Sequence, residues 1–411
     1  MKPKIRLKGF HGEWIESAFS ESFDSLKNNS LSRAELSDNG SVYNIHYGDV
    51  LITYNECVEI DKNVKTYVKD SEVARKLHLS CAIKNGDIIF ADAAEDNTVG
   101  KCTEVIAQES DEIVSGLHTI PCRPKKKFAS LYLGYYLNSK AYHDQLLPHI
   151  QGTKISSISK RALSQTHIRY PSDKNEQQAI ASYFQHLVSL IQSTTKKIES
   201  LKQVKAASLQ AMFPQVGETT PRLRFKGFEG EWEKGFLGSL FSERNESNIN
   251  AEMLSVTMNQ GVIKASQNGR HDNSNEDKSH YKLVKKGDIA YNSMRMWQGA
   301  SGYSPYEGIV SPAYTVISPA EDVCSRFFAY MFKTPGLINR FRLHSQGLTS
   351  DTWNLKYPAF SKIEVLFPPN KNEQEQIVSY FTSLDMQIHH HIQRLEKLKQ
   401  IKGACLDNMF V

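Results

Sequence analysis

Residues 292–299, NSMRMWQG, hold the densest group of side chains that could recognise a polar ligand. Four of them can form hydrogen bonds with the edges of nucleic-acid bases: Asn292, Ser293, Arg295 and Gln298. They alternate with Met294, Met296 and Trp297, which offer apolar contact area. The alternative is that Met and Trp belong to a core and that Arg295 is an ordinary surface charge. We predict that this stretch, with Trp297 included, binds DNA.

Two glycine-centred polar loops occupy matching places in the chain. Each follows an expected helical stretch, at 129–147 and 324–343, and they read HIQGTKISSISKRAL (149–163) and HSQGLTSDTWNLKY (344–357). Amide, hydroxyl and ammonium groups in such loops can contact base edges or phosphates. The candidate DNA-binding residues of the two loops are Gln346, Thr349, Ser350, Gln151 and Lys154, with Lys160 as a further basic neighbour.

The run Arg123-Pro-Lys-Lys-Lys is a local concentration of positive charge. Lys125 and Lys126 could contact the phosphate backbone, which positions a protein on DNA without reading its sequence. A run of like charges is more commonly a solvated surface, so both interpretations stay open. The net charge of +5 permits nucleic-acid binding but does not require it.

No catalytic motif is found in the sequence. There is no G-x-x-x-x-G-K-[ST] phosphate loop, no G-x-G-x-x-G after an expected strand, no H-E-x-x-H and no nucleophile elbow. Asp87 and Asp288 each follow a glycine, where an aspartate usually forms a turn. His389, His390 and His391 would point about 100° apart on a helix, so they cannot converge on one metal ion. We therefore expect no enzymatic activity, no cofactor and no metal site in this chain.

Length and composition are those of a two-domain globular protein. The chain has 411 residues, of which 40% are hydrophobic. No apolar run approaches the roughly 18 residues of a membrane span, and the basic N-terminal stretch lacks the apolar segment of a signal peptide. Six cysteines without a C-x-x-C pair are typical of reduced thiols. The expected location is the cytoplasm, without membrane contact.

The chain contains an internal duplication. The opening PKIRLKGFHGEW (3–14) returns as PRLRFKGFEGEW (221–232), with 8 of 12 positions identical. The segment KNEQQAIASYF (174–184) returns as KNEQEQIVSYF (371–381). Between these edges the two halves differ, apart from KNGDIIFA and KKGDIAYN, where Gly-Asp precedes a short apolar strand. We expect the repeated edges, with Trp14 and Trp232 as core anchors, to be scaffold, and the differing middles to recognise two different targets.

The closing segment of each half is predicted to be a long helix. Asn175 and Asn372 begin capping-box patterns with Gln178 and Glu375. Each helix of about 38 residues would extend roughly 57 Å. Apolar residues then follow a heptad pattern typical of a coiled-coil seam: Ile180, Phe184, Leu187, Ile191, Ile198 and Leu201 in the first copy, and Ile377, Phe381, Leu384, Ile388, Leu395 and Leu398 in the second.

Thr194 and His391 are the polar positions of this seam. They could fix the register of the pair, or they could mark a frayed, solvated layer. If the helices pair antiparallel, the globular units lie at opposite ends of a rod with an internal pseudo-two-fold axis. That geometry suits the reading of two separated sites on a DNA duplex, about 34 Å apart for one helical turn.

We therefore predict an α+β fold with two tandem target-recognition domains, joined by two long helices that form an antiparallel coiled coil. The expected parts are a first recognition domain (1–172), a first helix (173–214), a second recognition domain (215–370), and a second helix (371–411) that pairs with the first.

Over essentially its whole length the sequence resembles the specificity (S) subunits of type I restriction–modification enzymes. Three features carry the resemblance: the R-x-K-G-F-x-G-E-W opening of each half, KKGDIAYNSMRMWQGASG with GIVSPAYTV (308–316), and the KNEQ…I…SYF start of each helix. The resemblance places residues 292–298 and the loops around Gln346 and Gln151 in the family's recognition regions. The first half departs from the family pattern, because it reads IKNGDIIFADAAEDNTVGK and lacks the NSMRMWQG run.

The resemblance implies a non-catalytic DNA specificity subunit. Each globular domain would read one half of a bipartite target in double-stranded DNA. The helices would dock two methyltransferase (M) subunits, which would carry S-adenosylmethionine, and restriction (R) subunits would cut unmodified DNA. Two other interpretations stay open, a stand-alone DNA-binding regulator and a protein scaffold that does not bind DNA.

Overall fold

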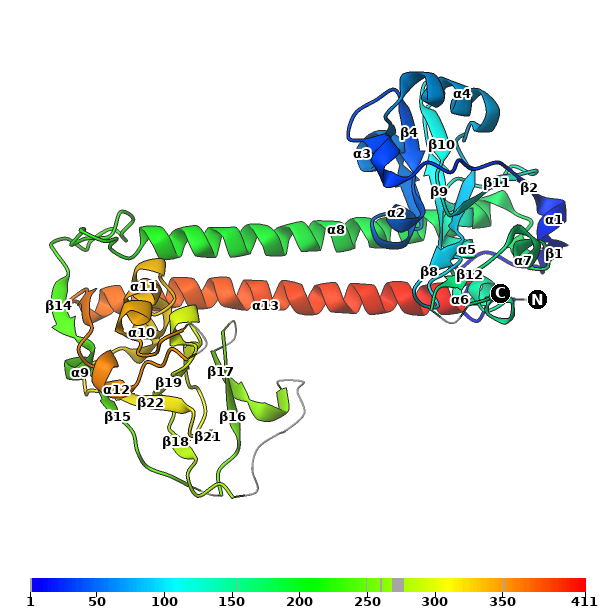
Figure 1. Cartoon of the computed structure of the whole chain (residues 1–411). Helices are drawn as coiled ribbons and strands as arrows, with labels where there is room; N and C mark the ends of the chain where they lie inside the picture. The colour runs from blue at the N-terminus through cyan, green and yellow to red at the C-terminus, as the bar shows by residue number, and fades with distance from the viewer. Residues whose placement is uncertain (1, 153, 249, 259–260, 268–276, 350–351) are drawn as a thin grey trace. The chain divides into compact units, whose positions relative to one another are not determined.

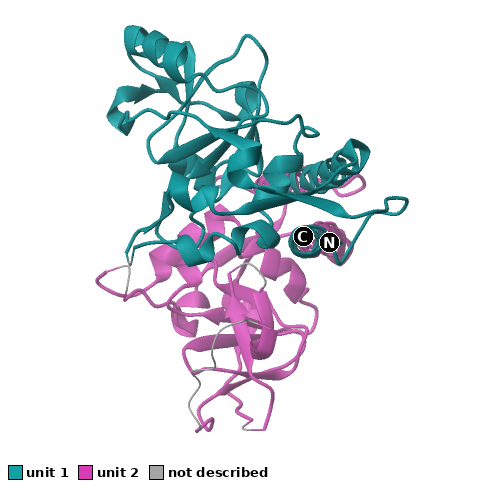
Figure 2. Ribbon diagram, turned by 90° about the vertical axis from the view of Figure 1, so that its right-hand side faces the viewer, with its two compact units in different colours: residues 1–195, 394–411 teal, residues 196–393 magenta. Residues whose placement is uncertain are grey.

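The computed structural model describes residues 2–411 except 153, 249, 259–260, 268–276 and 350–351 (Figure 1). The chain forms two compact units (Figure 2). Unit 1 comprises residues 1–195 and 394–411, and unit 2 comprises residues 196–393. Each unit therefore contains one globular region and one segment of each of the two long helices, α8 (Lys174–Ala211) and α13 (Lys371–Asn408).

Unit 1 is built on a five-stranded sheet with the order β2-β11-β7-β9-β5. Its strands are β2 (Phe23–Ser25), β5 (Cys57–Glu59), β7 (Ile88–Ala91), β9 (Cys102–Ile106) and β11 (Thr119–Pro124). A second sheet, β10-β4-β6-β3, contains β3 (Leu36–Ser37), β4 (Val42–Ile45), β6 (Tyr67–Val68) and β10 (Glu112–Ser115). Two ladders complete the unit: β1 (Trp14–Ala18) with β13 (His167–Pro171), and β8 (Ala93–Ala94) with β12 (Ser156–Ser157). Because β7 is central, all of its residues are buried.

Unit 2 has a smaller central sheet with the order β15-β22-β19-β20. Its strands are β15 (Phe241–Glu243), β19 (Ile289–Asn292), β20 (Ser301–Tyr303) and β22 (Tyr314–Pro319). Three antiparallel ladders accompany it: β14 (Glu233–Phe236) with β23 (Glu364–Phe367), β16 (Leu254–Thr257) with β17 (Gly261–Lys264), and β18 (Lys282–Val284) with β21 (Gly308–Val310). The predicted α+β class is confirmed. The Gly-Asp pair that the two halves share directly precedes the equivalent strands β7 and β19.

Short helices cover the sheets. In unit 1 they are α1 (Phe19–Ser22), α2 (Tyr47–Ile52), α3 (Ile60–Asn63), α4 (Ser71–Cys81), α5 (Tyr132–Leu137), α6 (Lys140–His143) and α7 (Lys160–Ser164). In unit 2 they are α9 (Leu237–Leu240), α10 (Ser325–Met331), α11 (Pro335–His344) and α12 (Tyr357–Phe360). The continuous helices expected at 129–147 and 324–343 are each divided. Ser139 caps a new helix in unit 1, and Pro335 starts one in unit 2, where proline fits the first turn.

The repeated opening phrase binds the start of the long helix in the same unit. In unit 1 the Arg6 guanidinium holds both carboxylate oxygens of Glu176 at 2.7 Å and donates to the Gly12 carbonyl at 2.6 Å. In unit 2 Arg224 holds Glu373 at 2.7 and 2.8 Å and donates to Gly230 at 2.6 Å. The repeated opening phrase therefore makes the same arginine–glutamate contact in both units.

In unit 2 the tryptophan of the opening phrase lies beside this ion pair. Trp14 and Trp232 are both buried, which confirms their role as core anchors. Trp232 also donates its indole N–H to Glu373 at 3.3 Å. The opening phrase therefore fixes the base of each globular region to α8 or α13.

The two long helices pair antiparallel within each unit. In unit 1 the beginning of α8 meets the end of α13, where Phe184 stacks on Phe410 at 5.7 Å. In unit 2 the end of α8 meets the beginning of α13, where the Lys205 ammonium lies 2.5 Å from Asp385 and Ser208 bonds Tyr380 at 2.8 Å. The predicted antiparallel coiled coil is confirmed. Most of the predicted seam residues are buried, and Ile191, Ile388, Leu395 and Leu398 are half-buried.

The helix caps differ from the prediction. Each long helix begins one residue before the expected asparagine. The side chain of Asp173 accepts the N–H of Asn175 at 2.8 Å, and that of Asn370 accepts the N–H of Asn372 at 2.9 Å. The capping residues are therefore Asp173 and Asn370, because an aspartate or asparagine directly before the first helical residue is already placed to accept.

The polar seam positions have different local roles. The Thr194 hydroxyl, although buried, donates to the Leu190 carbonyl of its own helix at 2.7 Å. Among the described residues the buried Nδ1 atom of His391 has no hydrogen-bond partner. Thr194 is thus satisfied locally, whereas His391 carries an uncompensated polar atom in the seam.

A buried carboxylate makes the stability of unit 1 depend on pH. Glu104 on β9 accepts the N–H groups of Leu131 and Gly134 at 2.7 and 2.8 Å, at the start of α5. Burial nevertheless raises its pKa from 4.5 to about 7. Because the folded state holds this proton more tightly, the stabilisation is complete below pH 4.5 and is lost as pH rises through 7.

We expect the free energy of unfolding of unit 1 to fall by at most about 1.4 kcal/mol per pH unit in this window. Glu104→Gln should flatten the slope, whereas Glu72→Gln on the exposed face of α4 should keep it. Hydrogen exchange of the β9 and α5 amides between pH 5 and 8 measures this. Equal slopes in both variants would contradict the assignment to Glu104.

Candidate nucleic-acid interface

In unit 2 the chain leaves β19 and makes a tight turn before β20, and we call residues 293–299 the reading turn of unit 2. The turn is closed where the Asn292 N–H donates to Ala300 at 2.8 Å. It contains the 3₁₀ turn η4 (Met296–Gln298) and ends at Gly299, whose φ of +80° favours glycine. Sequence and backbone thus agree that this segment is a defined turn.

The turn divides its polar side chains into two groups. The Asn292 side chain accepts the N–H of Met294 at 3.0 Å, and the buried Ser293 hydroxyl donates to the Ala313 carbonyl at 2.6 Å. These two hydrogen bonds hold the turn in shape, and direct base contact by either side chain stays a prediction. Arg295 and Gln298 are exposed beside Met294, so these three side chains are open to a ligand.

Two residues of the turn fix it to its surroundings. Met296 is fully buried in the core of unit 2, as the alternative interpretation of this stretch expected. Trp297 is half-buried and donates its indole N–H to the Met294 carbonyl at 3.0 Å. The Trp297 ring also meets the Trp353 ring edge-on at 5.2 Å. Trp353 belongs to the glycine-centred loop, so the aromatic pair joins the two predicted recognition segments.

The glycine loop of unit 2 lies beside the reading turn. Gln346 and Asn354 exchange two backbone hydrogen bonds of 3.0 and 2.8 Å, and the Leu355 N–H donates to the Ser293 carbonyl at 2.8 Å. Gln346 and Thr349 are exposed, and the Thr349 N–H donates to the Thr352 hydroxyl at 3.2 Å. Ser350 lies outside the described residues. The structure therefore brings Arg295, Gln298, Gln346 and Thr349 into one neighbourhood.

Unit 1 has the same frame, of which the sequence showed only the matching glycine loop. After β7 the Ala91 N–H donates to Lys101 at 2.9 Å, and we call the intervening residues 92–100 the reading turn of unit 1. The loop after α6 returns through Gln151 and Ser157, which exchange hydrogen bonds of 3.0 and 2.7 Å. Its β12 then pairs with β8 inside the turn. The Gly-Asp pair that precedes β7, as it precedes β19, is the sequence signal that could have located this turn.

The two reading turns differ in chemistry. The exposed residues of the unit 1 turn are two carboxylates, Glu95 and Asp96, which only accept hydrogen bonds, and Asn97 and Thr98, which both donate and accept. Asp92 pairs with His118 at 3.2 Å, although partial burial raises the Asp92 pKa. The unit 2 turn presents the donors of Arg295 instead. One frame therefore displays two different hydrogen-bonding surfaces.

The basic residues predicted in unit 1 have varied surroundings. Gln151 and Lys154 are exposed on the glycine loop. The Lys160 ammonium donates to the Leu26 carbonyl at 2.8 Å. Lys125 donates to the Ser20 carbonyl at 2.9 Å. Lys126 is exposed, with its ammonium 3.5 Å from the Tyr170 hydroxyl.

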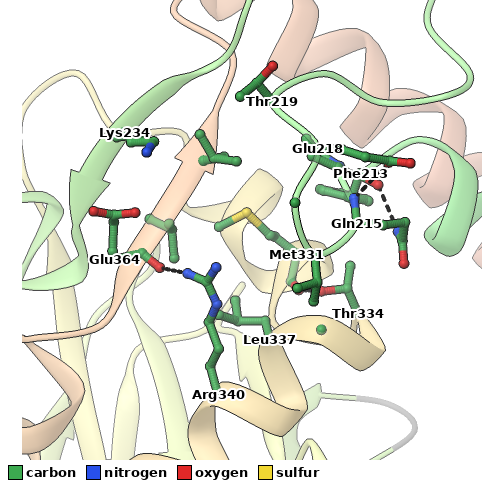
Figure 3. A pocket seen from close by; sticks show the side chains of 16 residues that line it. Phe213, Gln215, Glu218, Thr219, Lys234, Met331, Thr334, Leu337, Arg340 and Glu364 are labelled. Atoms are coloured by element: carbon green, nitrogen blue, oxygen red, sulfur yellow. Dashed lines mark hydrogen bonds between the residues drawn. The ribbon is translucent and has the colours of Figure 1, made fainter.

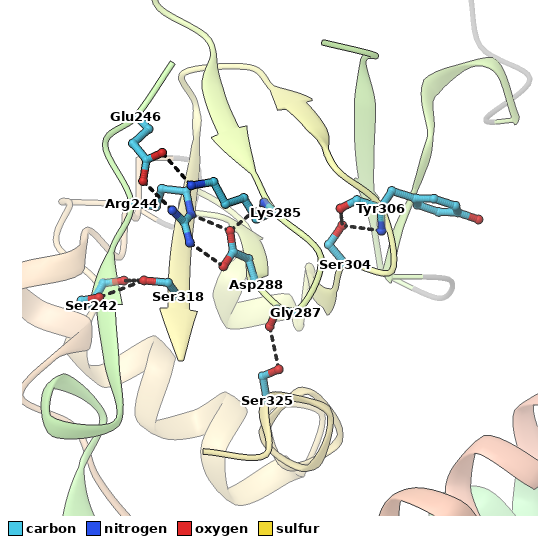
Figure 4. Close-up of polar contacts among 10 residues, drawn as sticks. All are labelled: Ser242, Arg244, Glu246, Lys285, Gly287, Asp288, Ser304, Tyr306, Ser318 and Ser325. Carbon is cyan, nitrogen blue, oxygen red and sulfur yellow. Dashed lines mark hydrogen bonds and ion pairs between the residues drawn. The ribbon is translucent and has the colours of Figure 1, made fainter. Parts of the chain in front are cut away.

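Arg123, part of the suggested phosphate clamp, is used by the fold. Its guanidinium binds Asp87 at 2.8 and 2.7 Å. Unit 2 repeats the contact with an arginine from another strand segment, because Arg244 binds Asp288 at 2.7 and 3.1 Å (Figure 4). Both aspartates also accept the N–H of the lysine three residues earlier, which confirms their turn-forming role.

The side chains of Arg244 and Lys285 also share Glu246, at 2.5 and 2.9 Å (Figure 4). The charged groups at the entry to β19 therefore neutralise one another. They hold the start of the strand that leads to the reading turn.

A cavity of about 220 Å³ lies where α8 ends and the second opening phrase begins (Figure 3). The lining of this cavity includes side chains of both charges, from Glu218, Lys234 and Glu364. Its apolar residues include Met331. Arg340 is held there by the Glu364 carbonyl. Among the described residues there is no group of three or more His, Cys, Asp or Glu side chains that could hold a metal ion.

Comparison with known families identifies the architecture. Residues 12–203 and 229–400 each match the model of the type I restriction modification DNA specificity domain. The chain belongs to this family. A search of curated protein sequences finds no match. No helix among the described residues is long and apolar enough to cross a membrane.

Two solved structures share the fold with TM-scores above 0.5. The crystal structure of the type I restriction–modification S subunit from M. genitalium is 15% identical, with 100% of this chain and 99% of that chain covered and a TM-score of 0.59. A chain from a study of complex assembly and conformational transition of the type I R-M system is 14% identical, with 96% of each chain covered and a TM-score of 0.55. The HsdS subunit from Thermoanaerobacter tengcongensis also matches, at 15% identity and a TM-score of 0.48.

Proposed function

We propose that this specificity-subunit family member reads a bipartite sequence in double-stranded DNA, one half with each unit. The observation that carries the proposal is the repeated frame of a reading turn and a glycine loop with different exposed side chains in each copy. A duplicated scaffold with two chemistries is what the reading of two unlike half-sites requires. Arg295 and Gln298 suit guanine and adenine edges, and the Glu95–Thr98 segment supplies acceptors for base amino groups.

The chain itself supplies no catalytic group in this account. The paired helices α8 and α13 set the spacing between the half-sites and dock two methyltransferase subunits, which use S-adenosylmethionine. Restriction subunits join that complex to cut unmodified DNA. The lysines of unit 1, Lys125, Lys126 and Lys154, contribute a salt-dependent grip on phosphates.

Replacing Arg295 by alanine tests the recognition role directly. A bidentate arginine–guanine contact contributes roughly 1–3 kcal/mol of discrimination, so preference at one base position of one half-site should relax about 10- to 100-fold. The other half-site should keep its preference, because it is read by unit 1. The measurement is the methylation rate of the complex with its methyltransferase subunit on duplexes that carry single-base changes.

Arg222→Ala is the matched control, because Arg222 is an exposed arginine of the same unit that pairs with Glu218. It should leave both half-sites unchanged. If Arg295→Ala behaves like this control, Arg295 does not read DNA. If neither the wild-type complex nor the variants prefer any sequence, the stand-alone or scaffold interpretation replaces the proposal.

A further inference from the structure

Lys333 lies at the corner between α10 and α11 and reaches under the reading turn of unit 2. Its ammonium donates to the backbone carbonyls of Gly299, Ser301 (2.7 Å) and Met258 (3.1 Å). Of the described carboxylates, none forms an ion pair with it. A half-buried ammonium held by carbonyls alone is an unusual use of a lysine, because such charges are normally paired or solvated.

The three carbonyls belong to the segments that define the turn. Gly299 ends the reading turn, Ser301 begins β20, and Met258 follows β16. The turn also packs closely on α11, because a Cβ atom built on Gly299 would lie 3.4 Å from Ile338. Lys333 thus ties both the end of the turn and the neighbouring β16 segment to the helical corner.

Unit 1 has a side chain in the same place. Asn138 directly follows α5, as Lys333 follows the end of α10, and each is followed by the residue that caps the next helix. The Asn138 amide donates to the Cys102 carbonyl at 2.8 Å and accepts the Cys102 N–H at 3.1 Å. Cys102 begins β9 directly after the reading turn, as Ser301 begins β20. An amide in one unit and an ammonium in the other therefore hold the same strand.

We infer that Lys333 and Asn138 are positioning residues that set the shape of the two reading turns and thereby the base preference of each half-site. This inference rests on the proposed function. Neither residue need touch DNA. Each fixes the backbone from which the exposed side chains of the turn extend, and displacement of such groups by an ångström is enough to lose a bidentate contact.

The two units should differ in their response to pH. Burial of the Lys333 ammonium, with a smaller contribution from the charge of Lys205, lowers its pKa from 10.5 to about 8. A neutral amine has two N–H groups, so one of the three carbonyls loses its donor above that pH. The amide of Asn138 does not titrate. The other charged or titratable groups that line the cavity around Lys333 are Lys205, Asp385, Arg326, Tyr330 and Tyr303.

The sign of the stability change separates positioning from a merely structural role. Because the folded state releases the Lys333 proton first, the unfolded state binds more protons between pH 8 and 10.5, and the free energy of unfolding rises in that window. Positioning predicts that discrimination at the half-site read by unit 2 falls over the same window, while that of the other half-site stays constant. If Lys333 had only a structural role, discrimination would not fall over a pH range in which stability increases.

The test uses the complex of the full chain with its methyltransferase subunit and duplexes with single-base changes in either half-site. From pH 7 to 9.5 the wild-type complex should lose roughly tenfold discrimination at the half-site of unit 2 only. Lys333→Met should show a comparable loss already at pH 7, and Lys333→Arg, which keeps a charged donor, should restore most of it. The dependence of binding on salt should not change, because no phosphate contact is removed.

The inference would be overturned if discrimination stayed constant across this pH range at both half-sites and the Lys333→Met complex discriminated as the wild-type complex does. So would an equal loss at both half-sites, which would indicate general unfolding. These results differ from failure of the proposed function, in which the wild-type complex would show no half-site preference at any pH.

Discussion

Replacing Arg224 by alanine is expected to lower the free energy of unfolding of unit 2 by about 3–5 kcal/mol. The Arg224 side chain is 15% exposed and that of its partner Glu373 is 1% exposed, so removing the guanidinium leaves a buried carboxylate without its counter-charge. The same change also removes the guanidinium donor of the exposed Gly230 carbonyl and leaves the indole of Trp232 as a remaining donor to Glu373. Loss of one partner of a buried pair costs far more than the intact pair contributes.

Arg222→Ala again provides the control, because its pair with Glu218 is formed between residues four apart and the Arg222 side chain is 70% exposed. That variant should lose less than about 1 kcal/mol. Urea denaturation followed by tryptophan fluorescence is suited to the comparison, since three of the four tryptophans, Trp232, Trp297 and Trp353, belong to unit 2. Equal costs for the two arginine variants would show that the repeated opening phrase does not anchor the helix start.

Replacing Gly152 by alanine is expected to weaken base discrimination strongly at the half-site read by unit 1. Gly152 has a φ of +103°, and a Cβ atom there would lie 2.0 Å from the Ile155 carbonyl oxygen. Backbone atoms cannot yield as a flexible side chain can, so the glycine loop must rearrange and carry Gln151 with it. We expect at least a tenfold loss of discrimination, on the order of one bidentate base contact.

Gly86→Ala separates the backbone strain from the steric clash. Gly86 lies in the same unit with a φ of +86°, but a Cβ atom there would meet no atom within 4 Å. That variant should cost about 1 kcal/mol of stability and keep the discrimination of both half-sites. Methylation of duplexes with changes in either half-site measures both variants, and a Gly152→Ala complex that still discriminates would remove the loop from the reading surface.

Much of the architecture could be predicted because it depends on local patterns. The seam of α8 and α13 follows from heptad spacing, and Phe184 and Phe381 are buried where that spacing places them. Burial of Trp14 and Trp232 follows from their place in a repeated scaffold. The Arg224–Glu373 contact joins two repeated phrases. Sequence spacing alone does not reveal that these two charged residues, 149 positions apart, form a pair.

The candidate site was less accessible to sequence reasoning. Residue type suggested that Asn292 and Ser293 contact bases, yet the turn uses both side chains to complete its own hydrogen bonds, which depend on the path of the backbone. The reading turn of unit 1 escaped notice because its side chains differ from those of unit 2 and only its backbone frame is shared. Lys333 looks like an ordinary helical lysine until three carbonyls from separate segments converge on it.

The most direct test of two-headed recognition is to co-express the chain with its methyltransferase subunit and to map methylated adenines across the host genome. The account predicts a split motif, with two short specific halves separated by a fixed, unspecific gap. Complete absence of a motif, with both proteins folded and associated, would contradict it.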